Sequence, residues 1–144
     1  MPSTIREQII AAFTARAQPL ASGNVQRVQR YHQNGSRNIS IWDGEETKID
    51  AEFKQQRMQF PIALDIQWEL VRNENASVST SALIGEVVKA MLAGDRTFNG
   101  VAERLEYFSA TPTYPDDGSG MVALVVIFNI IYSTKLGDPF LAAD

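Results

Sequence analysis

Apolar side chains occupy every second position from Met58 to Leu70, and the positions between them are mostly polar. Only the two-residue period of a β-strand produces this alternation, so we expect one face of the strand to be buried and the other to meet water. Pro61 falls inside the run and cannot donate a backbone hydrogen bond. Its presence predicts an edge position or a bulge at that point.

A second long strand is predicted from Met121 to Tyr132, where both faces are apolar and Asn129 is the single exception. Valine and isoleucine dominate this run, and their β-branched side chains favour a strand over a helix. A strand that is apolar on both sides is normally covered on both sides. Helices of a small domain usually cover one face, so the other face needs a further layer of this chain or a neighbouring subunit.

Two helices are predicted from apolar residues that recur every three to four positions, one from Ile5 to Arg16 and one from Thr80 to Ala93. Thr4 and Glu7 have the spacing of a capping box at the start of the first helix. Gly94 suits a left-handed residue directly after the second helix. The residues expected to face the core are Ile5, Ile9, Ala12 and Phe13 in the first helix and Leu83, Val87, Ala90 and Met91 in the second.

The remaining segments complete the predicted domain. We interpret the charged stretch from Glu45 to Gln56 as a surface excursion, residues 111–120 as a loop, and residues 137–144 as a candidate flexible C-terminal tail. Helices and strands in this order predict an α+β fold in a single domain over residues 1–144. Three shorter strands are expected at Val25–Tyr31, Ile39–Trp42 and Val101–Ala110.

Composition narrows the function classes. The chain has 144 residues, of which 44% are hydrophobic and 21% charged, as expected for a globular protein. Its net charge of −4 argues against a nucleic-acid or anionic-lipid surface, apart from a weak local patch at Arg27, Arg30 and Arg37. The absence of cysteine excludes disulfides and thiolate metal sites. No signal-peptide pattern or apolar run of about 18 residues is present, so we expect a soluble, cytoplasmic protein that does not enter a membrane.

Candidate chemistry is sparse. The one histidine, His32, lies in a predicted turn, and no nucleophile elbow or phosphate-binding glycine loop accompanies it. The segment from Asp116 to Gly120 has oxygen ligands for a hard cation but lacks the ligand spacing of an EF-hand, which favours an acidic hairpin loop. The sequence therefore predicts no enzyme activity, no cofactor and no metal site.

The order of the segments resembles the tail terminator (tail completion, or minor tail) proteins of long-tailed bacteriophages and prophages. The resemblance covers most of the chain and rests on Asp95–Gly100 after the second helix, the apolar strand that follows, and Gly137-Asp138-Pro139 at the end. One departure is Ser36-Arg37-Asn38, where relatives often carry a proline before the short strand.

This resemblance implies a mixed, mainly antiparallel β-sheet with two main helices packed on one face. It also implies a homo-oligomer, usually a hexameric ring, that caps the tail tube, stops its polymerisation and presents a surface to the head connector. The partners would be the tail tube protein and the head connector protein, with no sequence-specific nucleic acid. Such a protein acts in the cytoplasm of the bacterial host and is assembled into the virion tail.

The second apolar face of the last long strand is the candidate subunit interface, and two loops are candidate partner-facing segments. A related head–tail adaptor subunit, or a small ligand- or metal-binding domain that uses Asp116 and Asp117, remains an alternative. The interface residues are Val125, Ile127 and Ile131, and the loop residues are Arg30, Tyr31, Arg37, Tyr114, Asp116 and Asp117.

Overall fold

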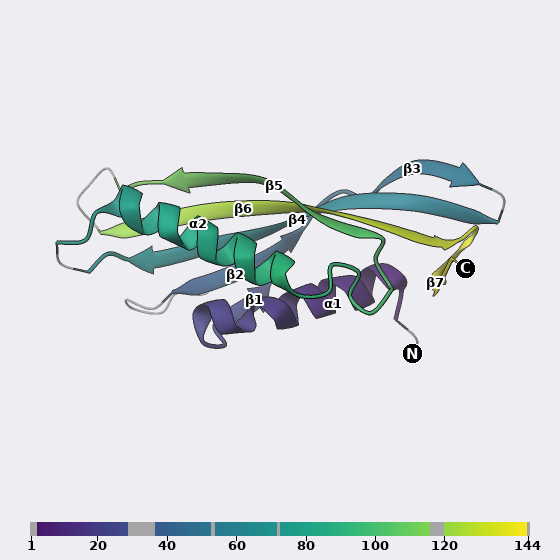
Figure 1. The fold of residues 1–144 in the computed structure, drawn as a ribbon, viewed down its shortest axis with the longest axis horizontal. Coiled ribbons are helices and arrows are strands. Elements are labelled where there is room, and N and C mark those ends of the chain that lie inside the picture. The colour runs from purple at the N-terminus through teal and green to yellow at the C-terminus, as the bar shows by residue number, and fades with distance from the viewer. Residues whose placement is uncertain (1–2, 29–36, 53, 72, 116–119, 144) are drawn as a thin grey trace.

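Seven strands form one sheet, and both helices pack on the same face of it (Figure 1). The computed structural model describes residues 3–28, 37–52, 54–71, 73–115 and 120–143. The strands β1 and β2 are parallel and every other pair is antiparallel, so the predicted α+β fold with a mixed, mainly antiparallel sheet is confirmed. The elements are α1 (Ile5–Ala17), a 3-10 turn η1 (Gln18–Ala21), β1 (Val25–Arg27), β2 (Asn38–Asp43), β3 (Thr47–Glu52), β4 (Gln55–Glu69), α2 (Ala76–Ala93), β5 (Arg104–Thr113), β6 (Met121–Lys135) and β7 (Asp138–Ala142).

The two longest strands, β4 and β6, organise the sheet. They pair along their whole length of 15 residues each, from Gln55 opposite Lys135 to Glu69 opposite Met121. The outer side of β4 carries β2 and then β3, and the outer side of β6 carries β5 and then β7. The sheet is thereby divided into a body, which holds β1, β2 and β5, and a four-stranded arm. The arm consists of β3, β7, residues 54–59 and residues 132–137; β7 lies next to α1, and the tip of the arm projects beyond both helices (Figure 1).

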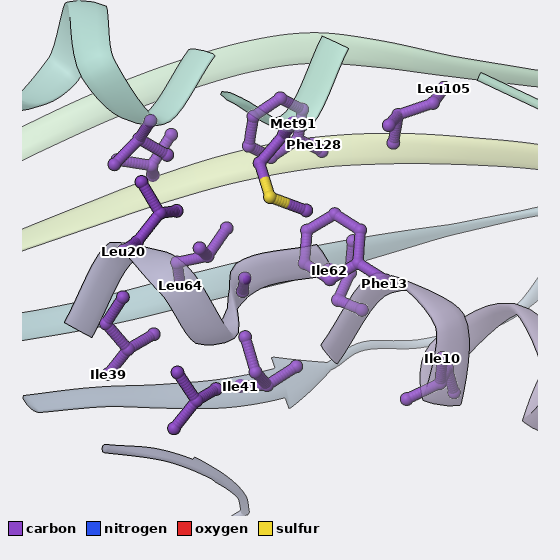
Figure 2. Packing of buried hydrophobic residues seen from close by; sticks show 14 of the residues in the cluster. Ile10, Phe13, Leu20, Ile39, Ile41, Ile62, Leu64, Met91, Leu105 and Phe128 are labelled. Carbon is purple, nitrogen blue, oxygen red and sulfur yellow. The ribbon is translucent and has the colours of Figure 1, made fainter. Parts of the chain in front are cut away.

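The core lies between the helices and one face of the body (Figure 2). The predicted stripe of α1 is confirmed, and Phe13 packs edge-on against Phe128 of β6 with ring centroids 5.8 Å apart. Alternation in β4 is also confirmed, because Phe60, Ile62 and every second residue onward face this core. Each buried side chain removes apolar surface from water, which is the main stabilising contribution to such a domain.

Local contacts fix the helix ends. Thr4 Oγ1 accepts a hydrogen bond of 3.1 Å from the Glu7 backbone N–H, which confirms the predicted cap. The Glu7 carboxylate does not reach back to Thr4; it binds both terminal nitrogens of Arg27 on β1 at 2.6 and 3.0 Å. The helix α2 begins at Ala76, earlier than predicted, because Asn75 accepts from two backbone N–H groups of its first turn.

The prediction for Gly94 is wrong. Its φ of −89° is not left-handed. The end of α2 is instead satisfied from outside the helix, because Arg16 of α1 donates a 3.0 Å hydrogen bond to the Met91 carbonyl. A cation at the C-terminal end of a helix also interacts favourably with the helix dipole.

The segment after α2 is a tight loop held by Asp95. Its carboxylate accepts from the backbone N–H groups of Thr97 at 2.9 Å and Asn99 at 2.8 Å. Hydrogen bonds from Thr97, first from its side chain, lower the pKa of Asp95. The loop inserts Phe98 into the core beneath the Arg16 guanidinium, 4.2 Å from the ring centroid. It also delays the start of β5 to Arg104, three residues after the predicted position, and β5 then runs on to Thr113.

Two segments predicted without regular structure contain strands. The stretch from Glu45 to Gln56, predicted as a surface excursion, contains β3 and the first residues of β4. The stretch 137–144, predicted as a candidate tail, contains β7, which pairs with the end of β6. Both strands lie in the arm, where little apolar surface is buried, so their sequences lack the apolar alternation that marks β4.

Pro61 lies in a central strand, so the predicted edge strand is wrong, but its local surroundings explain the proline. On its outer side, β2 stops pairing at Ile62 and β3 starts at Gln59. The Pro61 carbonyl accepts a hydrogen bond from the Gly44 backbone N–H at 2.8 Å. The Pro61 nitrogen, which has no hydrogen to donate, lies on the same edge of β4 and therefore faces this gap between β2 and β3. A Cβ on Gly44 would lie 2.6 Å from Pro61 Cγ, and only glycine therefore fits at the crossing.

Candidate assembly surfaces

The face of the sheet opposite the helices, here called the open face, has an apolar centre. Trp42, Ala63 and Ile127 stand side by side on β2, β4 and β6, and Val125 is the next residue of β6 on that face. All four side chains are only partly buried. In the part of the chain that the structure describes, no helix lies over this face (Figure 1).

The three predicted interface residues differ in accessibility. Val125 and Ile127 are partly exposed on the open face, where a second molecule can reach them. Ile131 lies on the same face beside Gln59 and Arg104, but only 5% of its surface is exposed. We therefore place the candidate contact at Val125 and Ile127.

The arm is a second apolar surface, and the sequence did not reveal it. Its exposed side chains include Leu136, 58% exposed at the turn between β6 and β7, and Phe140 and Leu141 of β7 at 44% and 47%. Ile49 of β3 is 40% exposed. Phe140 and Leu141 are consecutive in β7, so their side chains lie on opposite faces of the arm. Single exposed apolar residues are ordinary, but several on one projecting element are typical of an element that contacts other molecules. The available signal is the pair Phe140-Leu141 after Gly137-Asp138-Pro139, within the stretch predicted as a candidate flexible tail.

Charged side chains of both signs occur in the arm and on the open face of the body. Three of the four lysines in the chain, Lys48, Lys54 and Lys135, belong to the arm. The Lys54 carbonyl accepts from the Leu136 backbone N–H at 3.0 Å, so Lys54 and Lys135 flank Leu136 at the tip. The open face of the body carries Asp65 and Glu69 on β4. The arm also carries Asp50 on β3 and Asp138, which pairs directly with Lys135, and the open face also carries Arg104 opposite Ile131, so neither half of the sheet has a single sign of charge.

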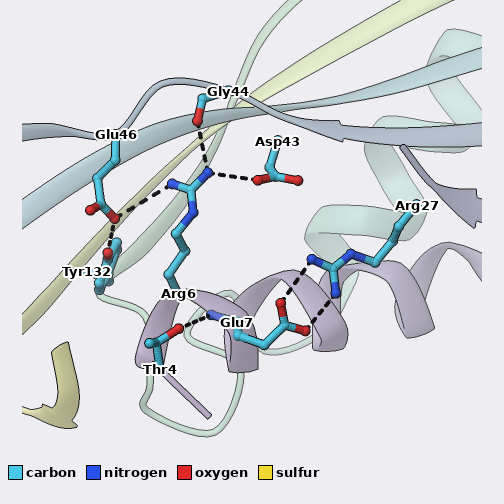
Figure 3. Close-up of polar contacts among 8 residues, drawn as sticks. All are labelled: Thr4, Arg6, Glu7, Arg27, Asp43, Gly44, Glu46 and Tyr132. Carbon is cyan, nitrogen blue, oxygen red and sulfur yellow. Dashed lines mark hydrogen bonds and ion pairs between the residues drawn. The ribbon is translucent and has the colours of Figure 1, made fainter. Parts of the chain in front are cut away.

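A polar cluster around Arg6 joins α1 to the base of the arm (Figure 3). The Arg6 guanidinium donates to Asp43 Oδ2 at 2.8 Å and to the Gly44 carbonyl at 2.9 Å. It also lies 3.6 Å from Glu46, which accepts a hydrogen bond from the Tyr132 hydroxyl. Burial, and then Glu46, raise the pKa of Tyr132. The cluster links the β2–β3 connection to both α1 and β6, which fixes the direction in which the arm leaves the body.

A second polar cluster lies at the base of the arm on the open face. Arg57 of β4 binds Asp50 of β3 at 3.1 Å and Glu103, next to β5, at 2.8 Å. The hydrogen bond from Arg57 lowers the pKa of Glu103 and raises that of Arg57. Partly exposed ion pairs of this kind contribute little stability individually, but three groups from three segments restrict relative movement.

The predicted partner-facing residues are placed only in part. The Arg37 side chain already has partners within the chain: it donates a hydrogen bond to the Leu20 carbonyl at 2.7 Å and forms an ion pair with Glu86 of α2 at 3.1 Å. Tyr114 is 42% exposed just after β5. The other four, Arg30, Tyr31, Asp116 and Asp117, lie outside the described residues, as does His32.

Within the described ranges, no group of three histidine or acidic residues is placed to hold a metal ion. One described helix, α2, is long and apolar enough to cross a membrane by length and composition, with a mean hydropathy of 1.3 over 18 residues. In this structure it packs Leu83, Val87 and Met91 into the core.

No protein-family model and no curated protein matches the chain. Several solved structures are similar in overall arrangement, and two of them are described here. The first, a chain from the virion of a native gene transfer agent particle, is 13% identical and has a TM-score of 0.44, with 89% of this chain and 90% of that chain covered. The second is 11% identical and has a TM-score of 0.48, with 87% and 94% covered. Similarity at this level carries no argument about what this chain does.

Proposed function

We propose that this protein is a structural assembly subunit of a phage-type tail, a tail terminator that forms a ring on the end of the tail tube. The ring would stop tube polymerisation and provide the surface that joins the head. The order of segments that resembles tail terminators supports this assignment. The structural observation that carries it is the presence of two different apolar surfaces, the open face and the arm, on one sheet.

Two unlike surfaces favour a ring over a simple dimer. A two-fold dimer buries the same patch on both subunits, whereas contacts between unlike patches repeat around an axis and close into a ring when the rotation per subunit divides a full turn. The role requires no catalysis and no cofactor, and the resemblance implies six subunits. With a net charge of −4 per chain, the lumen of such a ring would repel passing DNA rather than bind it.

The two ends of the molecule suit contacts on both sides of a ring. One end is the arm with Leu136 and Phe140. The opposite end exposes Val71 after β4, at 70%, and Val78 at the start of α2, at 68%. A terminator must bind the tube on one side and the head connector on the other, and it therefore needs two such ends.

Adding the protein to a polymerising tail tube protein from the same genome should shorten the tubes. The expected result is a tube length that falls as the ratio of this protein to tube protein rises, with a particle visible at one end by electron microscopy. A variant that remains monomeric, such as Ile127→Asp, is the matched control and should leave tube length unchanged. Tubes of the same length with and without the wild-type protein would contradict terminator activity.

The same tube-length assay distinguishes a tail terminator from the second candidate function, that of a head–tail adaptor subunit. The apolar side chains at both ends of the sheet favour this role equally. An adaptor would form the same ring and bind the head connector, but tube length would not change. Binding to connector without an effect on tubes would therefore replace the terminator assignment with the adaptor.

A further inference from the structure

We propose that Asn99 is a site of spontaneous covalent modification, at which the backbone nitrogen of Gly100 attacks the side-chain amide, and that the folded loop of residues 95–100 restrains this reaction. An asparagine followed by glycine is especially open to such an attack, because glycine has no Cβ to obstruct it. Both residues are exposed at the surface. This chemistry takes place within one chain and does not depend on the proposed ring.

The reaction needs only water besides the chain itself. The Gly100 nitrogen forms a bond to Asn99 Cγ while the bond from Cγ to Nδ2 breaks, and Nδ2 leaves as ammonia with the hydrogen that Gly100 gives up. The product is a five-membered succinimide ring. Water then opens the ring at either carbonyl, which yields aspartate or isoaspartate, the isomer in which the backbone runs through the side chain.

The loop engages the attacking nitrogen. The Gly100 N–H donates a 3.1 Å hydrogen bond to Thr97 Oγ1, and the same hydroxyl donates at 2.6 Å to Asp95 Oδ1. The second carboxylate oxygen of Asp95 accepts from the Asn99 backbone N–H at 2.8 Å. Ring closure requires the Gly100 nitrogen to turn toward the Asn99 side chain and to lose its hydrogen, so it must first give up the bond to Thr97.

The backbone conformation of the loop adds to this restraint. Phe98, Asn99 and Gly100 have positive φ angles of 49°, 63° and 86° in succession. Left-handed backbone is costly for a residue with a side chain, and it persists where the surroundings fix it. Phe98 is 5% exposed, and its ring lies under the Arg16 guanidinium. A rotation at Asn99 would therefore also disturb the packing of Phe98.

Modification would loosen the segment that follows α2. Isoaspartate adds one atom to the backbone of a loop in which the Asp95 carboxylate holds two N–H groups. The longer backbone cannot keep both of these hydrogen bonds and the position of Phe98 beneath Arg16. A chain that carries isoaspartate at this position should therefore melt at a lower temperature than the unmodified chain.

The experiment follows deamidation of the peptide that contains Asn99 by mass spectrometry, with isoaspartate and aspartate separated by chromatography. Folded wild type, Thr97→Val and Thr97→Ser are incubated in the same mildly alkaline buffer. Thr97→Val should react up to about tenfold faster than folded wild type, because the loss of one hydrogen bond shifts a local equilibrium by that order. Thr97→Ser keeps the hydroxyl and should react at a rate close to that of the wild type.

The unfolded chain supplies a reference rate. Asn34-Gly35 is the second Asn-Gly pair of the sequence and lies outside the described residues. In urea both pairs should react at similar rates, since the fold then holds neither of them. The ratio of the Asn99 rate in urea to its rate in the folded chain measures the restraint, and it should exceed about tenfold, because folding closes off reactions that need local opening.

Three results would overturn the proposal. If Asn99 stays unmodified in urea while Asn34 reacts, the pair is not a reactive site. If folded and unfolded wild type react equally fast at Asn99, the loop does not restrain the reaction. If Thr97→Val is folded by circular dichroism and reacts no faster than wild type, the hydroxyl is not the restraint. Should Thr97→Val fail to fold, Asp95→Asn, which weakens the same hydrogen bonds with little change in side-chain shape, replaces it in this comparison.

Discussion

Replacing Ile127 with aspartate is expected to dissociate the proposed ring into monomers while the chain stays folded. Ile127 lies at the centre of the apolar patch on the open face, and it is only partly buried in a single chain. In the ring, the new carboxylate would be buried without a partner, at a cost of roughly 3–5 kcal/mol for each contact. Association should weaken by more than about 100-fold, because each 1.4 kcal/mol corresponds to a factor of ten. Native mass together with circular dichroism measures both parts of this result.

The neighbouring residue supplies the matched control. Val126 is on the same strand, one position along, and its side chain faces the helices with 0% exposed. Val126→Asp should unfold the chain, because it places an unpaired charge in the core. If Ile127→Asp unfolds the chain in the same way, then the open face is part of the core. If Ile127→Asp keeps the wild-type mass, the face is not a subunit contact.

Replacing Phe128 with alanine is expected to lower the free energy of unfolding by about 3–5 kcal/mol. Phe128 is 0% exposed and lies between α1 and β5, with its ring 5.8 Å from Phe13 and 5.9 Å from Tyr107. Removing the ring deletes buried apolar surface and leaves a cavity that the rigid sheet cannot close. Urea denaturation at one fixed protein concentration measures the change, since association adds to the apparent stability.

Phe108→Ala on β5 is the control for the cavity. Phe108 lies at the register shift between Tyr107 and Ser109, and 72% of its surface is exposed. This substitution should change the unfolding free energy by less than about 0.5 kcal/mol. Equal losses at Phe108 and Phe128, or a loss below about 1 kcal/mol at Phe128, would contradict the packing of the core described above.

The elements that the sequence predicted are those that bury one side against the core. Apolar alternation located β4 because one of its faces packs on both helices, and the spacing of Ile5, Ile9 and Phe13 located α1 for the same reason. The strands β3 and β7 were missed because backbone pairing in the arm holds them, with little burial to mark their sequences. The end of α2 at Ala93 was predicted correctly, but the left-handed conformation predicted for Gly94 was wrong, because Arg16, distant in sequence, satisfies the carbonyl that a left-handed Gly94 would otherwise help to satisfy.

The candidate surfaces were predictable to a similar extent. The apolar pattern on both sides of residues 121–132 identified Val125 and Ile127 as candidate interface residues. Periodicity alone could not reveal that Ile131, the third candidate, is already buried within the chain. Arg37 was predicted to face a partner, whereas the fold brings Glu86 and the Leu20 carbonyl to it. The arm could not be anticipated, because its apolar residues are brought together by the pairing of β3, β4, β6 and β7 rather than by a local pattern.

Native mass of the wild-type protein over a range of concentrations, with negative-stain images of the same samples, shows whether the chain forms a ring. We expect a ring-shaped particle near the mass of six 16.0 kDa chains, about 96 kDa, that forms as concentration rises. A single species of 16.0 kDa at every concentration, with no rings in the images, would contradict it.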